Sequence, residues 1–133
     1  MFKKIDHVEI VTDQPDKTVE FYTQVLGFKI KLRDRIERSL VGVPMNLVYL
    51  DLGGTAVELI SYEGVSVEPT PQTEHLGYRM MALEVEDMQR TIEYLKEKGV
   101  EIVWGPRVRE KQYARAEIRD PNGYHIELRQ WFR

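Results

Sequence analysis

Residues 120–128 read DPNGYHIEL, and they decide the fold when they are set beside residues 53–60, which read GGTAVELI. Each stretch is a turn followed by a strand-like run with one glutamate between apolar residues, Glu127 in the later stretch and Glu58 in the earlier one. Asp-Pro-Asn-Gly and Gly-Gly both favour tight turns. Each half of the chain is therefore expected to end on a hairpin whose last strand carries an acidic side chain.

The segments upstream of these hairpins repeat as well. Residues 5–28 (IDHVEIVTDQPDKTVEFYTQVLGF) and 78–100 (YRMMALEVEDMQRTIEYLKEKGV) each give a strand-like run, a helix-like run, a glycine and an apolar residue. Internal repeats decide architecture before other signals do. We therefore predict an α+β fold in which two tandem βαβββ modules form a curled mixed sheet around a cavity. One domain spans residues 1–133, with modules at about 4–62 and 78–131 and a Pro-rich polar linker at about 63–77.

Local signals set the predicted boundaries of the elements. Pro15 suits the first turn of a helix, and Gly27 suits the position after its last turn. Asp87 is a good N-cap for a second helix, which Gly99 ends. Alternating side chains predict strands at residues 4–11, 28–33, 46–52, 100–104, 113–119 and 124–131.

Composition excludes several classes of protein. The chain has 133 residues, no cysteine and a net charge of −3. The missing cysteines exclude disulfides, thiolate nucleophiles and zinc–thiolate sites, and they suit a reducing compartment, so we expect a cytoplasmic protein. The charge gives no reason to expect a nucleic-acid partner, and no apolar run is long enough to span a bilayer.

The repeated pattern resembles the vicinal oxygen chelate superfamily, which includes glyoxalase I, methylmalonyl-CoA epimerase, extradiol dioxygenases and the fosfomycin- and bleomycin-resistance proteins. The resemblance covers nearly the whole chain, and it is carried by Ile5-Asp6-His7-Val8, Phe21-Tyr22, Leu26-Gly27-Phe28, Val57-Glu58-Leu59 and Asp120 to Leu128. It implies paired modules, a divalent metal and a homodimer. Methylmalonyl-CoA epimerases usually carry glutamine at the position of Glu58, so the resemblance is stronger to glyoxalase-I-like members.

The same resemblance implies a set of metal ligands. Carried over by position, the four ligands fall on His7, Glu58, residue 80 and Glu127, but residue 80 is Met80. A thioether is a poor ligand for a hard or borderline cation. The predicted set is therefore His7, Glu58 and Glu127 holding Ni, Co, Zn, Mn or Fe, between which the ligands do not decide. Glu9 shares the face of His7 and is a further residue of the cavity wall.

Two further histidines are candidates for the site. His125 lies two residues before Glu127 and so on the same face, as a general base, a substrate contact or a substitute ligand. His75 reaches the metal only if the 72–78 loop folds back. The competing interpretation is that arginines, among them Arg79, Arg115 and Arg129, neutralise both glutamates and that the histidines are structural.

Three functions follow from these alternatives. The first is a glyoxalase-like metal-dependent lyase or isomerase that moves a proton next to a carbonyl of a small oxygen-chelating substrate, with Glu127, Glu58 or His125 as the proton carrier. The second is a metal-free protein that binds a drug or another small molecule, as bleomycin-resistance proteins do, with Tyr49, Tyr113 and Trp131 lining its pocket. The third is a metal-dependent dioxygenase, which ranks last because the second histidine is missing.

Overall fold

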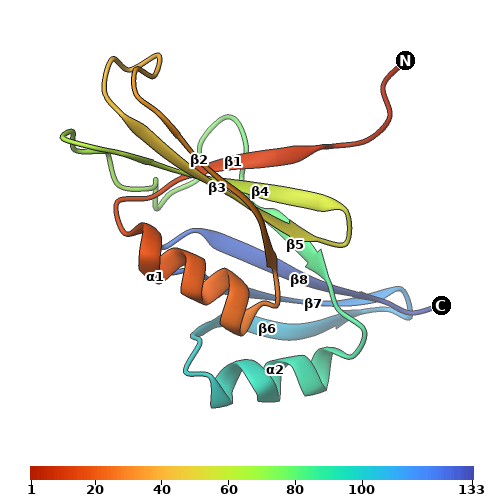
Figure 1. Ribbon diagram of the computed structural model, residues 1–133. Helices are drawn as coiled ribbons and strands as arrows, with labels where there is room; N and C mark the ends of the chain where they lie inside the picture. The colour runs from red at the N-terminus through yellow and green to blue at the C-terminus, as the bar shows by residue number, and fades with distance from the viewer. The chain divides into compact units, whose positions relative to one another are not determined.

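Two structurally equivalent units make up the chain in the computed structural model, which describes residues 1–133. The units are Met1–Pro69 and Thr70–Arg133. Each contains one four-stranded mixed sheet and a helix, and each sheet is open at both edges (Figure 1). The predicted α+β class and the tandem modules are therefore confirmed. Residues 63–80 between the two sheets contain neither helix nor strand.

The first unit follows the predicted order of elements. Its sheet has the strand order β1-β4-β3-β2, in which β1 runs parallel to β4 and the other neighbours are antiparallel. The elements are β1 (His7–Val11), α1 (Pro15–Glu20) with a π-helical turn (Phe21–Val25), β2 (Lys29–Ile36), β3 (Met45–Leu52) and β4 (Thr55–Tyr62).

The second unit has the same topology. Its sheet has the order β5-β8-β7-β6, again with one parallel pair, β5 with β8. The elements are β5 (Met81–Glu84), α2 (Met88–Glu97), β6 (Ile102–Arg109), β7 (Tyr113–Arg119) and β8 (His125–Trp131). Neither helix of the chain has the length and apolar character needed to cross a membrane.

Strand register makes the equivalence of the two units explicit. Glu9 lies opposite Glu58 in the first sheet, and Ala82 lies opposite Glu127 in the second. His7 therefore corresponds to Met80, two residues before Ala82, as the sequence repeat predicts. On the other side, Tyr49 lies opposite Glu58 and Glu117 lies opposite Glu127. The two sheets thus carry different side chains at equivalent places.

The predicted helix ends agree with the structure. Pro15 begins α1, and Gly27 has a positive φ of 83°, which glycine adopts without the cost that a Cβ adds. The carboxylate of Asp87 accepts a hydrogen bond from the backbone N–H of Arg90 at the start of α2. The Asp87 contact satisfies a backbone N–H that has no partner within its helix.

Each unit buries its own apolar core, and each helix packs on its own sheet, α1 on β4 and α2 on β6 and β8. Because successive side chains of a strand point to opposite faces, Glu58 and Glu127 lie on the other face of β4 and β8 from their immediate apolar neighbours. The core residues of the first unit include Val19, Tyr22, Phe28, Leu50, Val57 and Leu59, and those of the second include Met88, Ile92, Leu95, Ile118, Ile126 and Leu128.

Three strands differ from their predicted ranges by more than one residue. The first strand begins at His7 rather than residue 4, and β2 extends beyond residue 33 to Ile36 although its side chains are exposed throughout. The strand predicted at 100–104 runs from Ile102 to Arg109, across Gly105 and Pro106. A Cβ at position 105 would lie 2.9 Å from the carbonyl oxygen of Arg115, so this close approach requires glycine.

Candidate metal centre

Three side chains of the first unit form a cluster that we call the metal centre: His7 and Glu9 on β1, and Glu58 on β4. One ligand atom from each lies within 4.8 Å of the others. The parallel register of β1 and β4 explains the convergence, because it sets Glu9 beside Glu58 and places His7 on the same face of β1. Glu58 is buried, His7 is half-buried and Glu9 is exposed.

The ring of His7 is held on both sides. Its Nδ1 donates a hydrogen bond to Oδ2 of Asp6 at 2.9 Å, and its Nε2 lies 3.1 Å from Oε2 of Glu58. The edge of the ring packs against Tyr49, with ring centroids 5.2 Å apart. Because the Asp6 carboxylate only accepts, Nδ1 carries a proton and Nε2 is left to face Glu58. Two electron-rich atoms at 3.1 Å require a proton or a cation between them.

The charges around His7 shift its titration. The hydrogen bond to Asp6 raises the pKa of His7 above 6.5; burial opposes this shift, and the charge of Glu58 adds to it. The same hydrogen bond lowers the pKa of Asp6. Burial, followed by a hydrogen bond to Glu58, raises the pKa of the Tyr49 hydroxyl. When His7 is not protonated, the centre therefore holds a neutral imidazole among carboxylates, and the Tyr49 hydroxyl is a neutral hydrogen-bond donor.

This donor set fits a divalent cation. With His7 neutral, Glu9, Glu58 and the adjacent Asp6 bring three negative charges to one place, and a divalent cation would compensate most of this charge. Imidazole and carboxylate donors suit Zn, Ni, Co, Mn or Fe. A histidine ligand whose second ring nitrogen donates to a carboxylate is the usual arrangement around bound metals, because the carboxylate fixes the tautomer and the ring orientation.

Glu127, the third predicted ligand, lies on β8 in the second unit and has other partners there. Its Oε1 accepts a hydrogen bond from Nε of Arg129 at 2.9 Å, and Nε of Arg115 lies 3.5 Å from the same oxygen. Met80 and Ala82 stand where the first unit has His7 and Glu9. Glu127 as a metal ligand stays a prediction. Within its own unit Glu127 lies beside guanidinium groups, which is the arrangement that the competing interpretation proposed.

His125 is also bonded through both ring nitrogens. Its Nδ1 donates to Oε2 of Glu117 at 3.2 Å, and its Nε2 accepts from Nε of Arg119 at 3.4 Å. These contacts engage both ring nitrogens, and the role of His125 as general base stays a prediction. His75 lies exposed in the loop before β5, where Nδ1 contacts the carbonyl oxygen of Thr73 at 3.1 Å.

The buried carboxylate of Glu117 was missed by the sequence reasoning. Its side chain is only 3% exposed, and it contacts His125 and Arg115. The signal that would have revealed it is register, since Glu117 lies directly opposite Glu127 on β7. Arg115 and Arg129 also pack on aromatic rings, Arg115 on Trp104 and Arg129 on Tyr113 and Trp131. This face of the second sheet balances its own charges.

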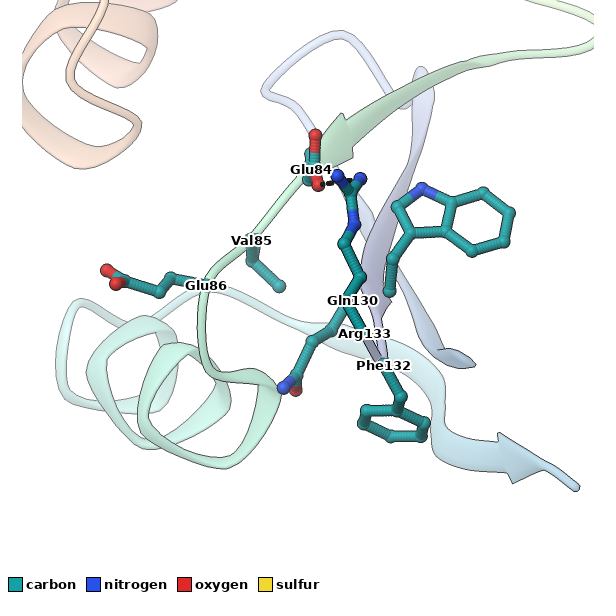
Figure 2. Close-up of a pocket in the computed structure, with 7 residues that line it drawn as sticks. Glu84, Val85, Glu86, Gln130, Phe132 and Arg133 are labelled. Atoms are coloured by element: carbon teal, nitrogen blue, oxygen red, sulfur yellow. Dashed lines mark hydrogen bonds and ion pairs between the residues drawn. The ribbon is translucent and has the colours of Figure 1, made fainter. Parts of the chain in front are cut away.

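A pocket of about 440 Å³ adjoins the metal centre in the first unit, and Tyr49 and Ala56 form part of its wall. Another pocket, of about 470 Å³, lies at the end of β8 in the second unit (Figure 2). Three of its polar side chains are already engaged, because Arg133 binds Glu84 at 3.0 Å and Gln130 accepts from the backbone N–H of Met88, which begins α2. The first pocket is therefore the better candidate for a substrate.

Comparison with known proteins identifies the family. The family model of the Glyoxalase/Bleomycin resistance protein/Dioxygenase superfamily matches residues 4–128, and the chain belongs to this superfamily, as the resemblance predicted. The uncharacterized protein YraH of Bacillus subtilis is 31% identical over 127 residues, which are 94% of this chain and 96% of YraH. Members of this superfamily often bind divalent metals and small molecules.

Solved structures share the fold. A glyoxalase family protein of Bacillus cereus matches with a TM-score of 0.85 and 21% identity, covering 100% of this chain and 97% of its own. The trypanothione-dependent glyoxalase I of Leishmania major matches with a TM-score of 0.71 and 26% identity over 96% of this chain and 86% of its own. TnmS3, an antibiotic binding protein from a Streptomyces species, matches with a TM-score of 0.68 and 20% identity over 98% of this chain and 97% of its own.

Proposed function

We propose that this protein is a metal-dependent lyase or isomerase of the glyoxalase type, which moves a proton next to a carbonyl of a small substrate with two neighbouring oxygens. The observation that carries the proposal is the metal centre, in which His7, Glu9 and Glu58 converge. The likeness to the Leishmania major glyoxalase I, at 26% identity, supports it.

We assign different roles to the residues of the metal centre. His7 and Glu58 would hold the cation, since Asp6 fixes the His7 ring and Tyr49 donates to Glu58. When bound, a divalent metal supplies Lewis acidity that stabilises the negative charge developing on a substrate oxygen. Glu9 is exposed and makes no hydrogen bond or ion pair. We therefore assign to Glu9 the role of the carboxylate that accepts the proton, because it is not fixed by other groups.

Glu127, Glu58 and His125 are the proton carriers proposed from the sequence, and they remain the alternatives to Glu9. Glu127 would first have to leave Arg129, and His125 would have to leave Glu117 or Arg119. Breaking a paired, partly buried contact costs several kcal/mol, on the order of 3–5. Glu9 has no such contact to break, and this difference favours Glu9 as the proton acceptor.

The test has two parts. Protein prepared without a histidine tag is analysed for bound metal by mass spectrometry, for the wild type and for Glu58→Ala, Glu9→Gln and Glu127→Ala. The metal-loaded proteins are then incubated in D₂O with hydroxyacetone, and exchange at the carbon next to the carbonyl is followed by NMR. We expect stoichiometric metal that Glu58→Ala loses, and exchange that Glu9→Gln loses while it keeps metal. No metal in the wild type, even after addition of Ni, Co, Zn or Mn, would refute the proposal.

A metal-free binding protein is the second candidate, favoured by the second unit. There Arg129 and Arg115 already compensate Glu127, and Trp104, Tyr113 and Trp131 offer aromatic surface. TnmS3 has the same fold and binds an antibiotic, although 20% identity supports the fold alone. Absence of metal together with binding of a planar organic ligand, read from Trp fluorescence, would favour this function.

We also propose a cytoplasmic homodimer. The edge strand β2 supports the dimer, because its apolar side chains Ile30, Leu32 and Ile36 are 45%, 49% and 40% exposed. Open edges of this kind are usually covered. Light scattering that gives the mass of one chain at micromolar concentration would exclude the dimer.

A further inference from the structure

A β-bulge turns a lysine into the pocket beside the metal centre. The pairing of β2 with β3 shifts between Ile30 and Leu32, so Lys31 is the extra residue of the bulge. Bulges re-aim side chains and are frequent next to functional sites. In a regular strand Lys31 and Leu32 would face opposite sides, whereas here both line the pocket of about 440 Å³.

Two residues that line the pocket are direct neighbours of the metal centre. Tyr49 lines the pocket, packs on the His7 ring and hydrogen-bonds Glu58. Ala56 lines the pocket and lies opposite His7 in the pairing of β1 with β4. A molecule held at His7 and Glu58 would therefore extend its remaining atoms past Tyr49 towards Leu32 and Lys31.

The charges in this pocket leave one ammonium group available. Asp6 is bound to His7, and Lys4 donates to the carbonyl oxygen of Gly54 at 2.7 Å. Asp51 lies opposite Lys29 in the pairing of β2 with β3, but no ion pair joins the two side chains. Lys31 makes no hydrogen bond or ion pair, although its charge acts on Asp6. Two lysines and two aspartates sum to zero, so the pocket does not attract anions in general. Lys31 is its one ammonium group without a hydrogen bond or ion pair, and Asp51 is its one carboxylate in the same state.

We propose that this pocket binds the tail of the substrate, and that Lys31 selects a tail that ends in a carboxylate. The inference rests on the proposed function, because the other end of the substrate is the part held at the metal centre. Leu32, Ala56 and the Tyr49 ring offer apolar surface to a short methylene chain. A single ammonium on a flexible stem supplies one point charge, which matches the single charge of one carboxylate.

Matched probes test the tail directly. The probes are 2-oxo diacids with two, three or four methylene groups, each compared with the unbranched 2-oxo monoacid of equal carbon number. Both members of a pair chelate through the same keto and carboxylate oxygens and differ only at the far end. Dissociation constants are measured from amide NMR shifts, for metal-free and zinc-loaded protein. The variants are Lys31→Met, Lys31→Arg and, as a matched control on the same strand, Lys29→Met.

In zinc-loaded wild-type protein we expect one diacid length to bind about threefold to fivefold more tightly than its monoacid, the range of a partly exposed ion pair. Lys31→Met should remove the preference without weakening the monoacid, while Lys31→Arg and Lys29→Met should keep it. Equal binding of diacid and monoacid, or a preference that survives Lys31→Met, would overturn the inference and leave the metal proposal intact.

The comparison of metal-free with zinc-loaded protein tests the proposed function and the carboxylate pocket separately. If zinc shifts no amides near His7, the proposed function fails, and the probes are then compared on metal-free protein. A preference there that depends on Lys31 supports the carboxylate pocket by itself, and the absence of one overturns it.

Discussion

Replacing Glu58 with glutamine removes one negative charge from the metal centre and keeps the shape of the side chain. Glu58 is buried, lies 3.1 Å from Nε2 of His7 and accepts from Tyr49, so it is the most fixed carboxylate of the three. An amide keeps a hydrogen-bond acceptor for Tyr49 but loses the attraction for a cation. We therefore expect Glu58→Gln to fold and to bind metal weakly.

The size of the effect follows from linkage. Groups that only orient metal ligands change affinity by about 10–100-fold, so loss of a charged ligand should cost about 100-fold. At a free metal concentration 100 times the wild-type Kd, binding stabilises the wild type by about 2.7 kcal/mol and the variant by about 0.4 kcal/mol. At about 4 °C per kcal/mol for a domain of this size, the Tm rises by about 11 °C in the wild type and by about 2 °C in the variant.

Differential scanning fluorimetry over a series of Zn or Ni concentrations measures these shifts, with each variant compared with its own metal-free Tm. The control is Glu20→Gln, which removes the same charge from an exposed position on α1 and should leave the metal shift unchanged. A Glu58→Gln protein that keeps the full wild-type shift would show that the cation binds elsewhere, and the function built on this centre would have to be abandoned.

Four further predictions concern the pH dependence of metal affinity, the pH dependence of stability, the partner of His7 and a helix cap. Because the pKa of His7 is raised above 6.5, metal affinity measured by calorimetry should fall as pH decreases through a midpoint above 6.5. In metal-free protein the contribution of His7 to stability is present below 6.5 and lost as pH rises through the raised pKa, so His7→Gln should destabilise more at pH 5.5 than at pH 9 in urea unfolding. Asp6→Asn should lower the pKa of His7, read from its imidazole proton shifts, because it removes the main cause of the shift; an unchanged pKa would contradict this. Asp87→Ala should reduce the free energy of unfolding by about 1 kcal/mol without changing metal affinity.

Much of the fold could be predicted because its signals are local. The repeat, Pro15, Gly27 and Asp87 each act on their neighbours in the chain, and the structure has them at the positions expected. The bulge at Lys31 could not be predicted, because it depends on which residues of β3 lie opposite β2. The exposed strand β2 beyond residue 33 has no inward-facing apolar pattern that would reveal it.

The candidate site was predicted less completely than the fold. His7 and Glu58 lie together as expected, and alternation alone places Glu9 on their face. The partners of Glu127 depend on cross-strand neighbours: Arg115 on β7 faces Arg129 on β8. Arg115 and Arg129 were named among several arginines, and only register selects them. Glu117 escaped notice because a glutamate among arginines and alanines in YARAEIR gives no sign of burial.

The equivalence of the two sheets has a consequence for any redesign of the second unit. Leu47 and Ile60 of the first unit correspond by register to Arg115 and Arg129 of the second. The second unit has Met80 and Ala82 in place of the imidazole and one acid, and it holds Glu127 beside the buried Glu117, with Arg115 and Arg129 as counter-charges. Introducing His at 80 and Glu at 82 would therefore not create a twin centre unless both arginines were also replaced by leucine and isoleucine.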